Sequence, residues 1–331
     1  MSRPPLELIC PAGTPAGLRA AVDAGAHAVY CGFRDETNAR NFPGLNFDRA
    51  EMRQGIGYAH SRGAKVFVAL NTFMRAGATD LWKQGVDHAV EAGADALILA
   101  DAALVAHARE RHPEQRLHLS VQAAAATPEA IAFYRERFGV ARVVLPRVLT
   151  IEEIARITAA AAPCETEVFV FGGMCVMAEG RCMLSSYATG KSPNRDGVCS
   201  PPGHVAYREQ GGAMLAALGG FTIERYARDE PAGYPTLCKG RFVADGTETH
   251  LFEDPVSLNA VDLLPKLAEI GVAGLKIEGR QRGRAYVAAV VRTFRRAIDA
   301  LATGAAVNAD AMTALTEGQR ATTGAYRKAW R

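Results

Sequence analysis

The chain of 331 residues lacks a long apolar run, a strong excess of one charge and an apolar N-terminal stretch. The longest apolar run, residues 168–178, is about half of what a membrane-spanning helix needs. The N-terminus "MSRPPLELICPAG" does not resemble a signal peptide. A formal net charge of +3 is too small to indicate a nucleic-acid or membrane partner by itself. These absences predict a cytoplasmic globular protein with no transmembrane segment and no nucleic-acid partner.

Several common catalytic signatures are missing as well. The chain contains no H-E-x-x-H, no P-loop and no G-x-S-x-G motif. The first predicted strand and helix are not joined by G-x-G-x-x-G, and the eight histidines form no pair at metal-ligand spacing. The sequence therefore argues against a zinc peptidase, a serine hydrolase and a dinucleotide-binding enzyme.

A degenerate unit recurs along the chain: a helix that ends in Gly, a short linker, and then a run rich in Val, Ile and Leu. It reads "DAGAHAVYCG" at 23–32 and "EAGADALILA" at 91–100. Continuous apolar runs of this kind are typical of parallel strands buried on both faces. Eight such strands alternate with helical patterns, which predicts an α/β fold of the (β/α)₈ TIM-barrel type, with an open doubly wound sheet as the alternative. The predicted helices are Pro15–Ala24, Phe47–Ser61, Thr79–Ala92, Ala102–Arg111, Pro128–Arg137, Ile151–Ala160, Leu258–Ile270 and Arg284–Leu301.

The regular spacing breaks once, after the seventh strand. More than eighty residues rich in Gly, Pro and Cys separate that strand, near 171, from its helix, near 258. We therefore predict a barrel over 1–302, a cysteine-rich insertion at 173–257 and a C-terminal tail at 303–331. The insertion follows the carboxyl end of a strand, and barrel enzymes carry their chemistry on that face.

The chain has seven cysteines, in two groups. Cys10, Cys31 and Cys164 lie in or just before strands and fit the ordinary role of small buried residues. In a reducing cytosol the other four point to metal or redox chemistry rather than disulfides. They lack the tight C-x2-4-C pairs of structural zinc sites, so their spacing favours a [4Fe–4S] cluster over zinc, although thiolates suit both metals. These four, spaced C-x6-C-x16-C-x38-C, are Cys175, Cys182, Cys199 and Cys238.

Polar residues follow several predicted strands, where a barrel places them at its mouth. For any single one, capping a helix is the commoner role, but arginines are suited to binding a carboxylate or phosphate. We consider Asn71, Gln122, Glu278 and Arg280 as catalytic candidates. The candidates for substrate binding are Arg147, Arg280 and Arg282, together with Asn38 and Asn41 of the "NARNF" loop.

One segment resembles a known family signature. "EVFVFGGMCVMAEGRCMLSS" at 167–186 is similar to the pattern E-x-F-x2-G-[SA]-[LIVM]-C-x4-G-x-C-x-[LIVM]-S of the collagenase-like peptidase family, unassigned peptidase family thirty-two. Gly173 departs from it, where Ser or Ala is expected. "NARNF", "LSVQA" and "LKIEGR" also look like family elements, so the resemblance covers about residues 6–300.

The resemblance implies oxygen-independent hydroxylation, with the four grouped cysteines binding a [4Fe–4S] cluster. Within the family, the chain is similar to a subunit that hydroxylates the aromatic ring of polyprenylated ubiquinone precursors. That similarity implies a heterodimer with UbiV, a lipid-carrier accessory protein, a polyprenyl-phenol substrate and prephenate as oxygen donor. The alternatives are an RNA base hydroxylase of the same family, a collagenase-like peptidase, and a non-catalytic electron-transfer or scaffold subunit.

Overall fold

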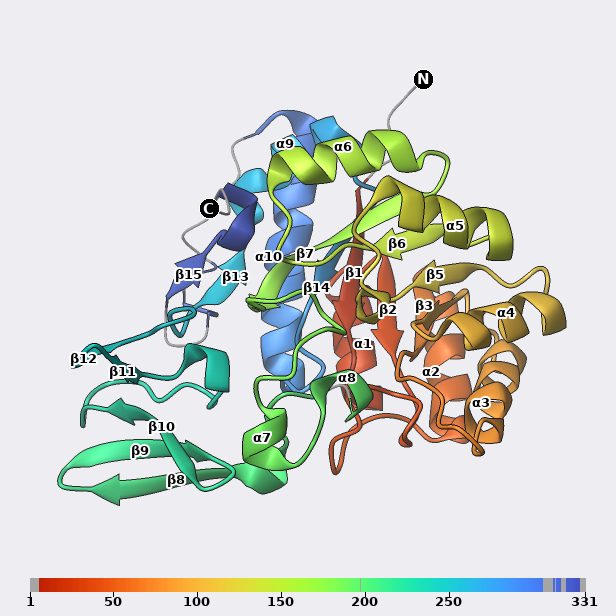
Figure 1. The fold of residues 1–331 in the computed structure, drawn as a ribbon. Helices are drawn as coiled ribbons and strands as arrows, with labels where there is room; N and C mark the ends of the chain where they lie inside the picture. The colour runs from red at the N-terminus through yellow and green to blue at the C-terminus, as the bar shows by residue number, and fades with distance from the viewer. Residues whose placement is uncertain (1–5, 197, 306–311, 313, 317–319, 328–331) are drawn as a thin grey trace.

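A closed barrel of eight parallel strands forms the body of the computed structural model, which describes residues 6–196, 198–305, 312, 314–316 and 320–327 (Figure 1). The strands follow the order β14-β1-β2-β3-β4-β5-β6-β7, and β14 pairs in parallel with β7 to close the ring. The predicted (β/α)₈ barrel is thereby confirmed. The barrel strands are β1 (Glu7–Pro11), β2 (Ala28–Cys31), β3 (Lys65–Leu70), β4 (Ala96–Leu99), β5 (Leu117–Leu119), β6 (Arg142–Val144), β7 (Glu165–Gly173) and β14 (Gly274–Ile277).

Helices surround the barrel, and local sequence sets where they begin. Asp48 and Thr150 each form a capping box, in which the side chain bonds the third helical N–H and a glutamate bonds back. Thr14 and Thr127 cap helices that start with Pro. These sequence-encoded caps explain why most predicted helix bounds agree closely with the structure. The helices are α1 (Pro15–Asp23), α2 (Arg49–His60), α3 (Asp80–Glu91), α4 (Ala102–Arg111), α5 (Pro128–Phe138), α6 (Ile151–Ala161), α9 (Leu264–Ile270) and α10 (Arg284–Thr303).

The inside of the barrel has two unlike halves. Strands β1 to β4 fill it with an apolar cluster that includes Ile9, Phe67 and Ile98. Strands β5, β6, β7 and β14 place buried polar and charged side chains there instead. These side chains are His118, Arg142, Glu167 and Lys276.

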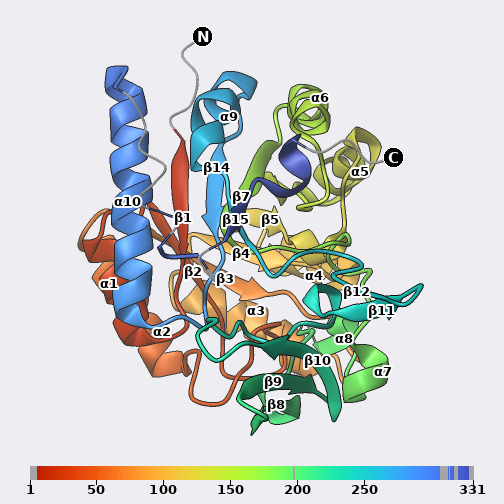
Figure 2. The ribbon, with the colours of Figure 1, turned by 90° about the vertical axis from the view of Figure 1, so that its left-hand side faces the viewer.

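The segment 173–257, here called the insertion, lies at the end of the barrel where the strands have their carboxyl ends (Figures 1 and 2). Its core is an antiparallel sheet of three strands in the order β10-β9-β8, and a two-stranded hairpin follows. The insertion thus stands over the face that sequence analysis assigned to chemistry. Its elements are α7 (Ser186–Thr189), α8 (Pro193–Asp196), β8 (Val205–Gln210), β9 (Ala213–Leu218), β10 (Phe221–Tyr226), β11 (Phe242–Ala244) and β12 (Thr247–Thr249).

One expectation about the return from the insertion was wrong in detail. The helix predicted from Leu258 begins at Leu264, because residues 257–259 form strand β13 (Ser257–Asn259), antiparallel to β7. The predicted tail, 303–331, lies partly outside the described residues. It nevertheless supplies β15 (Ala321–Thr322), parallel to β13, and the buried Tyr326, whose hydroxyl donates to the Phe169 carbonyl at 2.5 Å.

Long-range pairing explains why neither strand was predicted. Strand β13 and β15 are stabilised by partners that helical periodicity in the sequence does not reveal. Over the residues that the structure describes, no helix is both long and apolar enough to cross a bilayer.

Candidate active site at the barrel mouth

A polar cavity opens at the mouth of the barrel, beneath the insertion. Its walls come from the ends of the strands and from the loops that follow them. All four catalytic candidates from sequence analysis line it: Asn71, Gln122, Glu278 and Arg280, the last of which was also a candidate for substrate binding. Arg147 lines it too. Further lining residues that sequence analysis did not single out include Tyr30, Arg40, Phe169, Glu179 and Lys276.

Arg147 is a buried arginine whose charge is already paired. Its Nε donates to Glu179 Oε1 at 2.6 Å, and its Nη1 donates to the Gly173 carbonyl. The guanidinium carbon lies 4.2 Å from the centre of the Phe169 ring. Burial lowers the pKa of Arg147, but nearby negative groups outweigh that effect and raise it overall. Arg147 therefore joins the start of the insertion to the barrel, and most of its charge is used within the protein.

Arg280 is the buried cation that the protein leaves without a carboxylate partner among the described residues. Its Nη1 donates to the side-chain oxygen of Asn38 at 2.7 Å, and its guanidinium lies 5.4 Å from the centre of the Tyr30 ring. Burial, with a contribution from the charge of Arg40, lowers the pKa of Arg280 to about 10. A guanidinium stays protonated at neutral pH, so this site favours an incoming anion.

Glu278 and Lys276 complete the charged lining. Glu278 Oε2 accepts from the Gly173 N–H at 3.1 Å. Burial raises the pKa of Glu278, yet the charges of Arg40 and Arg147 outweigh it and lower the pKa overall, so the carboxyl is ionised at neutral pH. Lys276 Nζ donates to Glu167 Oε1 at 2.6 Å, 4.0 Å from the centre of the Tyr30 ring, and burial lowers its pKa.

Other predicted residues have different positions. Asn38 is buried and holds both Arg280 and Asn46, so it supports the cavity rather than lining it. Asn71 lines the cavity, and its side-chain oxygen accepts from the Ala39 N–H at 3.0 Å. Asn41 and Arg282 are exposed and are not among the lining residues. Sequence spacing identified the loop but not which of its side chains point inward.

Glu179 and Lys276 are two of the charged lining residues that sequence reasoning missed. Glu179 stands between two of the grouped cysteines, inside the family signature, at a position where the pattern allows any residue. Lys276 interrupts the apolar run "GLKIEG", and a charge in a buried strand is itself an indication of function or pairing. Both residues could have been found by searching the predicted strands and the family signature for charged residues that the fold must bury.

Gly180 fixes the position of the insertion over the mouth. Its backbone has φ +80°, and a Cβ there would lie 2.0 Å from the Gln122 carbonyl oxygen. Only glycine combines this conformation with so close an approach. The loop that carries Glu179 is therefore pressed against the loop after β5.

The four grouped cysteines lie in one neighbourhood of the insertion. Burial raises the pKa of Cys175 to about 12 and that of Cys238 to about 12, and it also raises the pKa of Cys182. In all three, the nearby Cys199 thiol group adds to the rise, so Cys199 is close to each of the others. The remaining three cysteines are buried in the body of the protein.

This grouping bears on which metal the residues fit. Within the described part of the chain, no three His, Cys, Asp or Glu side chains are close enough to hold a metal ion. The distances between side chains therefore do not distinguish zinc from an iron–sulfur cluster, and the choice rests on the type of donor. An all-thiolate set is the preferred donor set of an iron–sulfur cluster, which spreads its ligands over several irons.

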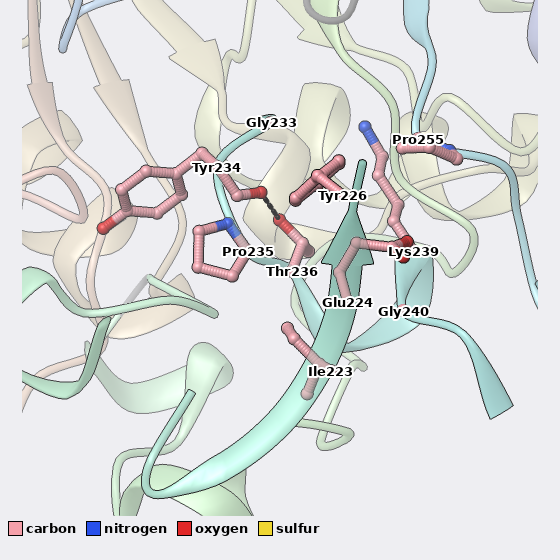
Figure 3. A pocket seen from close by; sticks show the side chains of 10 residues that line it. All are labelled: Ile223, Glu224, Tyr226, Gly233, Tyr234, Pro235, Thr236, Lys239, Gly240 and Pro255. Atoms are coloured by element: carbon pink, nitrogen blue, oxygen red, sulfur yellow. Dashed lines mark hydrogen bonds between the residues drawn. The ribbon is translucent and has the colours of Figure 1, made fainter. Parts of the chain in front are cut away.

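A second, small pocket lies inside the insertion, and Tyr234 and Lys239 are among the residues that line it (Figure 3). Lys239 Nζ donates to the Val256 carbonyl at 2.8 Å, and Tyr234 donates to the Ser200 carbonyl at 2.9 Å. Since Ser200 and Lys239 directly follow Cys199 and Cys238, these bonds fix both cysteine-bearing turns. The pocket walls thus hold the backbone of the cysteine site.

The fold and site define a (β/α)₈ barrel protein with a charged mouth beneath a four-cysteine insertion. The Peptidase family U32 model matches residues 13–328, and the chain belongs to that family. It is 34% identical over 321 residues to tRNA hydroxylation protein P of Escherichia coli, covering 90% of this chain and 69% of that protein.

Two further relatives have names that indicate different roles. A 23S rRNA 5-hydroxycytidine synthase of Escherichia coli is 30% identical, over 89% of this chain and 40% of its own length. A collagenase of Porphyromonas gingivalis is 28% identical, over 90% of this chain and 66% of its own length. The family is thereby established, while the names of its members span hydroxylation and proteolysis.

Proposed function

We propose that the chain is the iron–sulfur subunit of an oxygen-independent hydroxylase, and that Cys175, Cys182, Cys199 and Cys238 bind a [4Fe–4S] cluster. The observation that carries the proposal is the grouping of four thiols in the insertion over a charged barrel mouth. Relatives named as hydroxylation proteins support the reaction class. When bound, the cluster would supply one-electron chemistry at the mouth.

For the substrate, we propose the aromatic ring of a polyprenylated ubiquinone precursor, as in UbiU, with UbiV as partner subunit and a lipid-carrier accessory protein. The insertion carries eight of the ten large hydrophobic side chains described as exposed, from Met183 to Phe252. It also contains ten acidic and eight basic residues. An apolar, slightly acidic rim suits a prenylated ring better than a polyanion.

We further propose prephenate as the oxygen donor, because its carboxylate groups could bind Arg280, the buried cation at the mouth that has no carboxylate partner among the described residues. Arg280 would bind a carboxylate of the donor, while Arg147 is already bound to Glu179. In this arrangement the arginine orients the donor, and Glu278 and Gln122 line the same cavity, where they can contact the reacting groups.

Loss of the cluster provides the first test. Protein purified without oxygen should contain iron and sulfide, and Ser substitutions at Cys199 or Cys238 should remove most of both. Cys164→Ser is the matched control, since Cys164 is buried next to β7 at the opposite end of that strand. Wild-type protein free of iron and sulfide would contradict the proposal.

An RNA base hydroxylase is the second candidate, supported by the relatives named for tRNA and 23S rRNA hydroxylation. RNA binding would weaken steeply as salt rises, because phosphate contacts dominate such affinity. Salt-dependent RNA binding, with unchanged quinone intermediates after deletion of the gene, would favour RNA. If deletion of the gene instead makes under-hydroxylated quinone precursors accumulate in cells grown without oxygen, the first candidate is favoured.

A peptidase role has no support in the cavity. Its lining contains Ser120 but no His or Cys that could activate or replace it. A non-catalytic electron-transfer role is separated by assaying hydroxylation with the cysteines of each subunit substituted in turn. Activity that survives loss of this chain's cluster would assign the chemistry to the partner.

A further inference from the structure

One oxygen of the Glu179 carboxylate is bound, and the other has no partner. Oε1 accepts from Arg147 Nε at 2.6 Å, whereas Oε2 is buried without a hydrogen bond from any described residue. The side chain is 5% exposed and lines the mouth cavity. A buried carboxylate oxygen without a donor is unfavourable, so the site gains stability when a bound molecule supplies one.

The position of this oxygen is fixed from both sides. Arg147 is itself held by the Gly173 carbonyl and the Phe169 ring. On the other side, Gly180 is pressed against the Gln122 carbonyl. Glu179 therefore cannot turn toward solvent without breaking a buried ion pair, and its free oxygen stays beside the cavity.

The rest of the lining offers cations together with polar groups that are already bonded or reach solvent. Arg280 and Lys276 carry N–H groups. Glu278 Oε2 accepts from the Gly173 N–H, and the Tyr30 hydroxyl donates its proton to the Ile277 carbonyl. Among the described lining residues, Glu179 Oε2 is the one side-chain oxygen that is buried without a hydrogen-bond partner. A ligand that carries both an anionic group and a hydroxyl therefore finds a cation for the first and the Glu179 oxygen for the second.

We propose that Glu179 Oε2 is a substrate-binding atom that accepts a hydrogen bond from the hydroxyl group of a phenol. This assignment rests on the proposed function, since it names the residue that recognises the phenolic end of the aromatic substrate. Arg147 acts as a positioning residue, because it holds Oε1 and so determines where Oε2 lies.

The test compares three small aromatic acids on the full chain purified without oxygen: para-hydroxybenzoate, para-methoxybenzoate and benzoate. Wild-type protein should bind para-hydroxybenzoate about tenfold more tightly than para-methoxybenzoate, because only the hydroxyl can donate to a carboxylate. In Glu179→Gln, the amide oxygen keeps Arg147 and the amide N–H₂ replaces Oε2. The preference should then vanish or reverse, while benzoate affinity changes by less than about twofold.

Glu209→Gln is the matched control, because Glu209 is exposed on β8, and it should keep the wild-type preference. A preference unchanged in Glu179→Gln, with iron content intact, overturns the proposal. Should that variant fail to fold, equal affinities of wild-type protein for the hydroxy and methoxy acids overturn it equally. A preference that depends on Glu179 in protein with no cluster or hydroxylase activity would sink the proposed function and leave the binding site standing.

Discussion

Two charged clusters share the inside of one barrel, and they differ in how their charges are matched. At the floor, where the strands begin, Arg142 contacts Glu7 at 2.6 Å and Glu167 at 3.3 Å. Glu167 also contacts Lys276 at 2.6 Å, and Lys276 lines the mouth cavity, so this residue joins the two clusters. At the mouth, Arg147 is paired with Glu179, while Arg280 has an amide partner in place of a carboxylate.

The difference separates structural charge from functional charge. Strands β1 and β6 are not neighbours in the sheet, so the Glu7–Arg142 pair crosses the barrel interior and fixes strands together. Every buried member of the floor cluster has an opposite charge, as burial demands. The mouth keeps one guanidinium and one carboxylate oxygen incompletely satisfied, which is the condition of a site that awaits a ligand.

The largest effect is expected at the floor. Arg142→Met would remove the cation that the half-buried Glu7 and the buried Glu167 share, leaving each with a single lysine partner, and the free energy of unfolding should fall by about 3 kcal/mol. Chemical denaturation measures this, with Lys266→Met at an exposed ion pair as control, where the loss should stay below about 1 kcal/mol. Equal effects of the two variants would refute the structural reading of the floor.

A smaller effect on stability, but a clear one on binding, is expected at the mouth. Arg280→Gln removes a cation that no described carboxylate pairs with, so unfolding free energy should change by less than about 1 kcal/mol. The affinity for benzoate should fall about tenfold, because the charged hydrogen bond is lost. Titration calorimetry measures the affinity for benzoate. The control is Arg284→Gln, at an exposed arginine, which should bind benzoate as tightly as the wild type does. Unaltered affinity in Arg280→Gln would move the anion site elsewhere.

The smallest effect concerns pH at the floor. Burial, together with the charges of Arg142 and Arg116, lowers the pKa of His118 well below 6.5. Below pH 6.5 the unfolded chain takes up a proton on this residue that the folded chain refuses, so stability falls as pH falls. His118→Leu should make unfolding less sensitive to acid by about 1 kcal/mol per pH unit. Chemical denaturation at several pH values below 6.5 measures how the free energy of unfolding depends on pH. The same pH dependence in wild type and His118→Leu would contradict the assignment.

The fold could be predicted from sequence because its determinants are local. Gly residues after helices, apolar runs and caps such as Asp48 and Thr150 recur at each unit. Strand β13 could not be found in this way, because its partner β7 is distant in sequence and its residues also fit the start of a helix.

The site was predictable only in part, for the same reason. The position of Arg280 after a strand placed it at the mouth, but its freedom from a carboxylate depends on which side chains other strands supply. The pairing of Arg147 with Glu179 requires the insertion to fold back over β6 and β7, which spacing does not encode. The partner of a charged residue inside a strand, such as Lys276, can be predicted only once the register of the neighbouring strands is known.

The buried Tyr326 has a consequence for biosynthesis. Its bond to Phe169 spans 157 positions, and Met174, just before Cys175, packs against Gly324. All four cysteines are therefore synthesised well before residues 321–327, the segment that packs against Met174. The contact that holds Met174, next to Cys175, therefore forms only after residues 321–327 have been made, so the last segment of the chain completes the packing around the first of the four cysteines.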